Sequence, residues 1–248
     1  AQELMRCADL ALFAAKEKGR DTLALYDQAL DRAARERRDI EADLREVIAR
    51  GQLGLHYQPV INLDTGKIAG YEALLRWYHP QRGIMTPSEF LYVAEETGMI
   101  VPIGEWVIRQ ALAETAEWDG SFRIAINLSP TQMRSPHLAE VVAQAIHAHG
   151  TDPERVEFEI TEHVLLQENG VCTGNLEKLR ELGTKIALDD FGIGYSSLSY
   201  LRRFPFDRIK IDRAFVDGID SSADNQAIVA SITRLAEALG MATTAEGI

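Results

Sequence analysis

Residues 185–192 read KIALDDFG, an apolar run that ends in two adjacent aspartates, a phenylalanine and a glycine. Five other strand-like runs also end in an acidic residue, an amide or a lysine. The residues at their ends are Glu72, Asn127, Glu159 with Glu162, Lys210 and Glu246. Apolar strands that finish in this way, with helical stretches between them, are typical of a (β/α)8 barrel, whose strand ends meet on one face. The pattern therefore predicts an α/β, TIM-like barrel with one polar face.

The order of the expected strands sets the topology. The runs at 53–63 and 67–77 are joined by a DTG link too short for a helical crossover, so the first strand should be antiparallel. Further strands are expected at 122–128, 155–161, 184–190, 206–212 and 241–246. Helices are expected between them at 87–97, 101–118, 135–149, 169–182, 196–202 and 222–239. This alternation predicts a parallel sheet, and the number of units favours a closed barrel.

Only seven barrel strands are expected in this chain, whereas a closed barrel of this type has eight. One more strand and its helix would be needed after Ile248. We therefore predict that the C-terminal strand is missing from this chain, which would leave an unpaired strand edge.

The first 50 residues follow a different pattern. Residues 3–18 have apolar positions at helical spacing, and residues 22–26 (TLALY) form a short strand-like run. Residues 28–50 are rich in charge and contain neither Pro nor Gly. This predicts one continuous helix, either solvated or connecting two domains.

The composition and charge limit the classes of partner. The 248 residues are 46% apolar, with a formal net charge of −12. Such an acidic balance argues against binding of a DNA or RNA duplex, which requires a basic surface. It is compatible with a small anionic ligand, because bound metal ions can reverse the local sign of a site.

Cysteine use and hydropathy indicate the compartment. Cys7 and Cys172 lack metal-ligand spacing, as expected for unpaired thiols in a reduced setting. No apolar run approaches the roughly 18 residues of a membrane span, and no signal peptide opens the chain. We therefore expect a cytoplasmic location and no membrane contact from this segment.

Carboxylates gathered on one barrel face would repel one another unless cations lay between them. The six histidines do not form a set with metal-ligand spacing. Oxygen ligands prefer hard divalent ions, so Mg²⁺ or Mn²⁺ is expected. The pattern therefore indicates a metal-dependent enzyme.

Each candidate residue also has a simpler explanation. Adjacent aspartates such as Asp189 and Asp190 usually cap a helix or lie in a solvated turn, although here they follow a buried type of run. Glu72 could form an ion pair with Arg76, because an unpaired buried carboxylate is costly. Asn127 could cap the helix that follows it.

Glu162 and Lys210 have alternatives of the same kind. Glu162 could be an acid favoured by a helix N-terminus. Lys210 could form a structural ion pair with Asp212 or with one of the strand-end acids. A buried lysine also shifts its pKa readily, so Lys210 could instead activate or position a water molecule.

From about Leu53 onward, the sequence resembles the EAL domain, the bacterial cyclic-di-GMP phosphodiesterase module. Seven family motifs occur in the family's order. They are QPV at 58–60, EAL at 72–74, NLS at 127–129, EITE at 159–162, DDFGIGYSSL at 189–198, KID at 210–212 and AEG at 245–247. A match to all seven in order is highly specific.

The resemblance implies a (β/α)8 barrel with an antiparallel first strand, and hydrolysis of cyclic di-GMP to linear pGpG. It also implies two divalent ions, which can generate a hydroxide and neutralise the phosphate. Asp189 would bridge the two ions. By motif position, the metal ligands would be Glu72, Asn127, Glu159, Asp189, Asp190 and Glu246.

The same resemblance implies roles for five other residues. Lys210 would position or deprotonate the attacking water. Glu162 would tether the loop after Asp190, which in this family couples dimerisation to the active site, so a homodimer through that loop is expected. The substrate contacts would be Gln58, Arg76 and Asp212.

Residues 1–27 resemble the closing helix and strand of a GGDEF domain, although the GGDEF signature itself is absent. We therefore predict a GGDEF remnant at 1–27, a connecting helix at 28–50, and an EAL phosphodiesterase domain at 51–248 that is truncated at its C-terminus. An upstream GGDEF domain is expected in the parent protein.

Two other functions remain open at this point. One is a catalytically idle EAL module that binds cyclic di-GMP as a sensor or acts as an interaction scaffold. The other is a generic metal-assisted barrel lyase or hydrolase. Idle members typically lose metal acids, whereas this chain retains every one that it is long enough to contain, which favours the enzyme.

Overall fold

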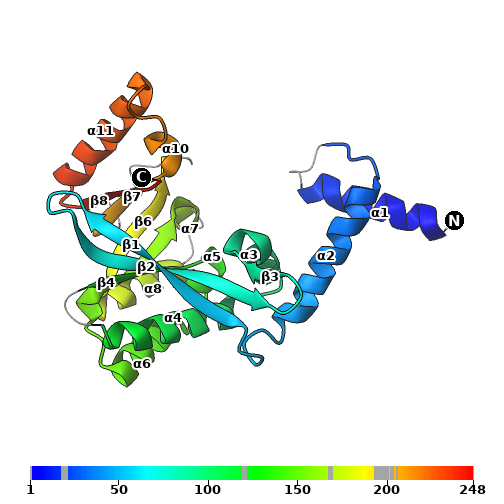
Figure 1. The fold of residues 1–248 in the computed structure, drawn as a ribbon, viewed down its shortest axis with the longest axis horizontal. Coiled ribbons are helices and arrows are strands. Elements are labelled where there is room, and N and C mark those ends of the chain that lie inside the picture. Colours follow the sequence, from blue (N-terminus) through cyan, green and yellow to red (C-terminus); the bar gives the residue numbers. More distant parts are fainter. Residues whose placement is uncertain are drawn as a thin grey trace.

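The computed structural model describes residues 2–17, 22–118, 122–166, 170–192, 201, 204 and 206–247. A single curled sheet forms its centre, and most of the helices lie outside the sheet (Figure 1). The strands are β1 Leu53–Asn62, β2 Lys67–His79, β3 Gly83–Met85, β4 Arg123–Asn127, β5 Val156–Thr161, β6 Lys185–Phe191, β7 Arg208–Ile211 and β8 Ala242–Ala245.

The sheet has the predicted topology. Its strand order is β1-β2-β4-β5-β6-β7-β8, and the short β3 pairs with β2 outside this path. β1 and β2 are antiparallel, and every later pair along the path is parallel. The hairpin closes where the DTG link was noted, with Gly66 at a φ of 65° that glycine adopts without steric cost.

The sheet curls into a partial barrel (Figure 1). Within the described residues, β1 pairs only with β2 and β8 pairs only with β7. The fold class is confirmed, since an α/β barrel with an antiparallel first strand and no eighth barrel strand has this open seam. The extra strand β3 was not predicted, because three residues carry too little alternation to be recognised.

The helices account for the alternation seen in the sequence. Their bounds are α1 Gln2–Glu17, α2 Gln28–Leu44, α3 Pro87–Glu96, α4 Ile100–Ala116, α5 Pro130–Met133, α6 Leu138–His149, a 3₁₀ turn Pro153–Arg155, α7 Glu162–Leu166, α8 Gly170–Glu181, α10 Arg213–Val216 and α11 Ala223–Ala238. Local sequence explains their starts. At α3, Thr86 and Glu89 form a capping box ahead of Pro87. No helix within these described residues combines the length and hydropathy needed to cross a membrane.

Two predictions for the first 50 residues are wrong. Residues 22–26 do not form a strand: Leu23 and Leu25 are 81% and 79% exposed, and no described strand lies alongside to pair with them. The helix predicted at 28–50 ends at Leu44 and is followed by turns. Its last part is not solvated, because Leu44 joins the hydrophobic core of the barrel. The helix expected at 196–202 lies, except for residue 201, outside the described residues.

A buried histidine attaches α2 to the barrel. His79 closes β2, is only 5% exposed, and its Nε2 lies 3.0 Å from Asp43 Oδ2 on α2. Its Nδ1 accepts hydrogen bonds from the backbone N–H groups of Gln81 and Arg82, both at 3.2 Å. Because an accepting Nδ1 leaves the proton on Nε2, the ring donates to Asp43. Figure 1 shows α2 leading away from this attachment toward α1.

His79→Ala should therefore destabilise the domain by about 1–3 kcal/mol, because it removes a buried ring together with its hydrogen bonds to Asp43, Gln81 and Arg82. The free energy of unfolding in urea measures this loss. His137→Ala is the matched control and should be nearly neutral, because the His137 side chain is 74% exposed and has only a distant partner in Glu140. Equal free energies of unfolding in the two variants would contradict the role of His79 in attaching α2 to the barrel.

Candidate active site

One ammonium group lies among four carboxylates at the carboxyl ends of the strands. Lys210 Nζ lies 2.6 Å from Glu159 Oε2, 2.7 Å from Glu246 Oε1, 3.3 Å from Asp189 Oδ1 and 3.5 Å from Glu72 Oε2. These residues belong to or directly follow β2, β5, β6, β7 and β8. The barrel therefore brings together residues that are up to 174 positions apart, counted from Glu72 to Glu246.

Burial makes this cluster electrostatically demanding. The side chains of Lys210 and Glu159 are 4% and 3% exposed. Burial alone would lower the pKa of Lys210, but Glu159, Asp189 and Glu72 overcome this effect and raise the pKa above its ordinary value. Burial also raises the pKa of Glu159 well above its usual range, against the attraction of Lys210. The lysine thus stays charged, and the carboxylates do not all ionise freely.

Glu246 shows the same balance at the end of β8. Burial raises its pKa, and the hydrogen bond and charge of Lys210 oppose that shift. Its backbone N–H continues the ladder by donating to Ile211 at 3.1 Å, which fixes its position beside β7.

Asn127 is held at the site and not at a helix end. Its Nδ2 donates to Glu72 Oε1 at 2.7 Å. The cap of the following helix α5 is Ser129, whose hydroxyl accepts from the Gln132 N–H, so the alternative role of Asn127 as a cap is wrong. Glu72 in turn contacts Lys210, and the structure shows no ion pair between Glu72 and the described Arg76.

The backbone turns between the two aspartates of β6. Asp190 has a φ of 55°, a left-handed conformation that aspartate tolerates better than most residues, and the register with β7 breaks here. The Asp190 N–H donates to Asp189 Oδ1 at 2.9 Å. Asp189 faces Lys210, while Asp190 lies toward Asp212. Burial, followed by repulsion from Asp189 and Asp212, raises the pKa of Asp190.

Glu162 is both the first residue of α7 and a support for the chain after β6. Its Oε1 accepts from the Gly192 N–H at 3.1 Å. The helix-terminal role considered from the sequence is thus compatible with the tethering role. The loop expected to mediate dimerisation lies mostly in residues 193–200, outside the described part of the chain.

The three expected substrate contacts lie around the cluster. Gln58 on β1 is exposed and is the register partner of Glu72. Arg76 follows Glu72 by four residues on β2, and its Nη1 donates to the Leu75 carbonyl at 2.8 Å. Asp212 caps α10 by accepting from the Ala214 N–H.

The donor set fits a hard cation, although its present arrangement does not enclose one. In the described ranges, no three His, Cys, Asp or Glu side chains are placed to hold a metal ion. The Lys210 ammonium lies where the carboxylates converge and balances part of their charge. Carboxylate and amide oxygens are the ligands that Mg²⁺ and Mn²⁺ prefer.

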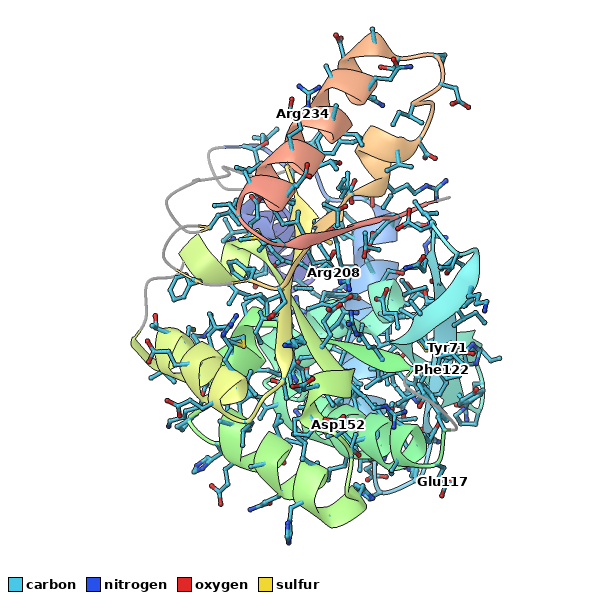
Figure 2. All side chains as sticks on the ribbon, turned by 90° about the vertical axis from the view of Figure 1, so that its left-hand side faces the viewer. Tyr71, Glu117, Phe122, Asp152, Arg208 and Arg234 are labelled. Carbon is cyan, nitrogen blue, oxygen red and sulfur yellow. The ribbon has the colours of Figure 1, made fainter. Side chains whose placement is uncertain are left out.

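A second charged pair lies below this cluster and was missed in the sequence. Arg208 Nε lies 3.0 Å from both carboxylate oxygens of Glu157, and Arg208 Nη1 donates to Thr244 Oγ1 at 3.0 Å. Figure 2 shows Arg208 among the central strands, whereas Arg234 lies on the outlying α11. The available signal was period-2 spacing, because Glu157 and Arg208 each precede a site residue by two positions.

A sequence model of the EAL domain matches residues 41–248. The chain belongs to the EAL-domain family. The match begins within α2, and the boundary predicted at residue 51 remains a prediction, as does the GGDEF remnant.

Relatives of known sequence extend well beyond this chain. The uncharacterized protein y4lL of Sinorhizobium fredii is 46% identical over 246 residues, covering 99% of this chain and 30% of that protein. MucR of Pseudomonas aeruginosa, a bifunctional diguanylate cyclase and cyclic-di-GMP phosphodiesterase, is 40% identical over 250 residues, covering 99% of this chain and 36% of MucR. The chain thus spans about a third of the length of these relatives.

Solved structures of EAL proteins have the same fold. The PaMucR phosphodiesterase in complex with cyclic di-GMP has a TM-score of 0.80 and 41% identity, covering 85% of this chain and 87% of that one. Klebsiella pneumoniae BlrP1 in a calcium and cyclic-di-GMP complex has a TM-score of 0.71 and 32% identity, covering 79% of this chain and 49% of that one.

The raised carboxyl pKa values give a prediction for the metal-free domain. Glu159, Asp190 and Glu246 return to ordinary values near 4 when the chain unfolds. Between those values and the raised folded values, the folded state holds protons that the unfolded chain has released. Stability should therefore fall as pH rises above the ordinary carboxyl range, through the raised pKa values of the folded state. Urea unfolding in EDTA measures this slope.

Glu159→Gln should flatten the slope, because an amide does not titrate. Adding Mn²⁺ at pH 8 should raise the free energy of unfolding by mass action if the folded cluster takes up the ion. A slope that is unchanged in the Glu159→Gln variant would contradict the electrostatic description of the cluster.

Proposed function

We propose that the domain is a metal-dependent cyclic-di-GMP phosphodiesterase that hydrolyses cyclic di-GMP to linear pGpG. The supporting observation is the carboxylate cluster around Lys210, which gathers more negative charge than one ammonium can balance. Such a cluster is suited to divalent cations at a barrel face where enzymes of this architecture carry out their chemistry. Membership of the EAL family supplies the substrate class.

Two Mg²⁺ or Mn²⁺ ions would be held in this site. Glu72, Asn127, Glu159 and Asp189 would hold one ion, and Asp189, Asp190 and Glu246 the other. When bound, the ions would activate a water molecule and neutralise the phosphate. Calcium in the BlrP1 complex supports the use of divalent cations in this family.

The chain's own residues would bind the substrate and control water. Arg76 suits a phosphate oxygen, because its guanidinium makes charge-assisted hydrogen bonds. Gln58 and Asp212 lie beside Glu72 and Asp190, so they would contact the dinucleotide at the rim. Lys210 would position or deprotonate the attacking water, and Glu162 would hold the segment after Asp190 through Gly192.

The wider context is also part of the proposal. Residues 1–27 would be the end of a GGDEF domain, and the match to the bifunctional MucR, which covers 99% of this chain, supports this. The domain would act in the bacterial cytoplasm to lower the level of the second messenger. A homodimer would form through the loop after Asp190.

Purified protein with Mg²⁺ or Mn²⁺ should convert cyclic di-GMP to pGpG, and EDTA should abolish the reaction. Chromatography of the products over time measures this conversion. Binding of cyclic di-GMP without product would support the idle sensor instead. Turnover of other phosphodiesters but not of cyclic di-GMP would support the generic hydrolase.

Glu72→Ala should lower the hydrolysis rate by more than about 100-fold, because changes to residues that merely support metal ligands already cost 10–100-fold. The fold should persist, since Glu72 lies at the surface of the cluster with an 18% exposed side chain. Glu140→Ala is the matched control, as that carboxylate is 66% exposed on α6. Equal hydrolysis rates in the two variants would show that Glu72 does not belong to the catalytic site.

A further inference from the structure

A second layer of charge lies directly beneath the carboxylate cluster. Glu157 and Glu159 are on one face of β5, and Arg208 and Lys210 are on one face of β7, because side chains two residues apart share a face. The lower pair, Glu157 with Arg208, therefore repeats the upper pair, Glu159 with Lys210. Two acid–base pairs thus join the same two strands, one above the other.

The lower pair is built into the barrel. The side chains of Glu157 and Arg208 are 8% and 17% exposed. They meet across β6, where the fully buried Ala187 is the register partner of Arg208 and leaves room for the long side chain. On the other side, Arg208 reaches the Thr244 hydroxyl on β8. One guanidinium therefore connects three strands around the interior.

Stability alone is a poor explanation for such a pair. Apolar residues of similar volume often replace a buried ion pair without loss of stability. The guanidinium instead fixes orientation, because its N–H donors lie in one plane and hold the groups that they bind in a defined geometry. The residues placed two positions further along the same strands are Glu159, Lys210 and Glu246, all within the upper cluster.

We propose that Glu157 and Arg208 are positioning residues for the cation site. Their contacts set the relative placement of β5, β7 and β8, and hence where Glu159, Lys210 and Glu246 lie when a divalent ion is bound. Cation affinity therefore depends on a pair that touches neither the ion nor the substrate. This inference rests on the metal site of the proposed function.

Arg208→Lys in the full chain tests the proposal. The variant keeps the positive charge but loses the fork that joins Glu157 to Thr244. Its affinity for Mn²⁺, measured without substrate by the electron paramagnetic resonance signal of the free ion, should fall by about tenfold or more. At saturating Mn²⁺, the KM for cyclic di-GMP should remain within about twofold of the wild-type value, because Arg76 and Gln58 are untouched.

Arg155→Lys is the matched control for a purely structural arginine. Arg155 also donates from Nε and an Nη atom, here to the carbonyls of Phe122 and Thr115. These acceptors lie away from the cluster, so this variant should lose stability but keep its Mn²⁺ affinity. Mn²⁺ affinity within twofold of wild type in Arg208→Lys, together with a lower melting temperature, would show that Arg208 is structural only.

A double variant guards against misfolding of the single one. Glu157→Gln with Arg208→Met removes the pair without leaving a buried charge unpaired, so it should fold. It too should bind Mn²⁺ about tenfold or more weakly, and wild-type affinity in this variant would overturn the proposal.

Failure of this inference is distinguishable from failure of the proposed function. If the wild-type chain binds Mn²⁺ but yields no pGpG, the phosphodiesterase assignment fails, while the variant affinities still decide the positioning role. If hydrolysis is normal and the variants bind Mn²⁺ normally, only the positioning role fails. If the wild-type chain binds no Mn²⁺, there is no cation site to position, and the inference is overturned.

Discussion

The contact of one lysine with four carboxylates is the interaction on which the polar face of the barrel depends. In a buried site, each carboxylate added raises the cost of ionising the others. Lys210 offsets part of that cost, and its own pKa is raised although burial acts in the opposite direction. The remaining negative charge is not balanced within the cluster. The site thus carries excess negative charge, which favours the uptake of cations.

Strand geometry explains how such a cluster can form in a stable domain. Side chains alternate across each strand, so the interior-facing Glu159 and Lys210 are flanked by residues that face the helices. Those neighbours, such as Phe158 and Ile209, are fully buried in the hydrophobic core. The apolar face of each strand therefore stabilises the fold through burial. This stabilisation offsets the electrostatic cost of the charged side chains on the opposite face.

The sequence allowed the barrel and the strand-end residues to be predicted, because both follow from local patterns: alternation, a short DTG link and repeated polar endings. Other features depend on tertiary contacts that no local pattern records. Residues 22–26 have strand-like composition, but a strand requires a partner, and no described strand lies beside them. The helix from residue 28 ends at Leu44, and both Leu44 and Val47 pack into the core of the barrel. The Glu157–Arg208 pair was not predicted, because its members lie near the starts of β5 and β7 and not at the polar strand ends that indicated the site.

The two layers of charge have different consequences because their surroundings differ. In the upper layer, four carboxylates share one ammonium, so the excess charge can be met only by protons or by added cations. In the lower layer, Glu157 is matched by one guanidinium that binds both of its oxygens, so nothing further is required. A charged pair whose hydrogen bonds are all made is held rigidly, whereas a cluster with unbalanced charge changes when protons or cations bind. Under the proposed function, the upper layer would bind ions while the matched pair beneath it keeps the supporting strands in place.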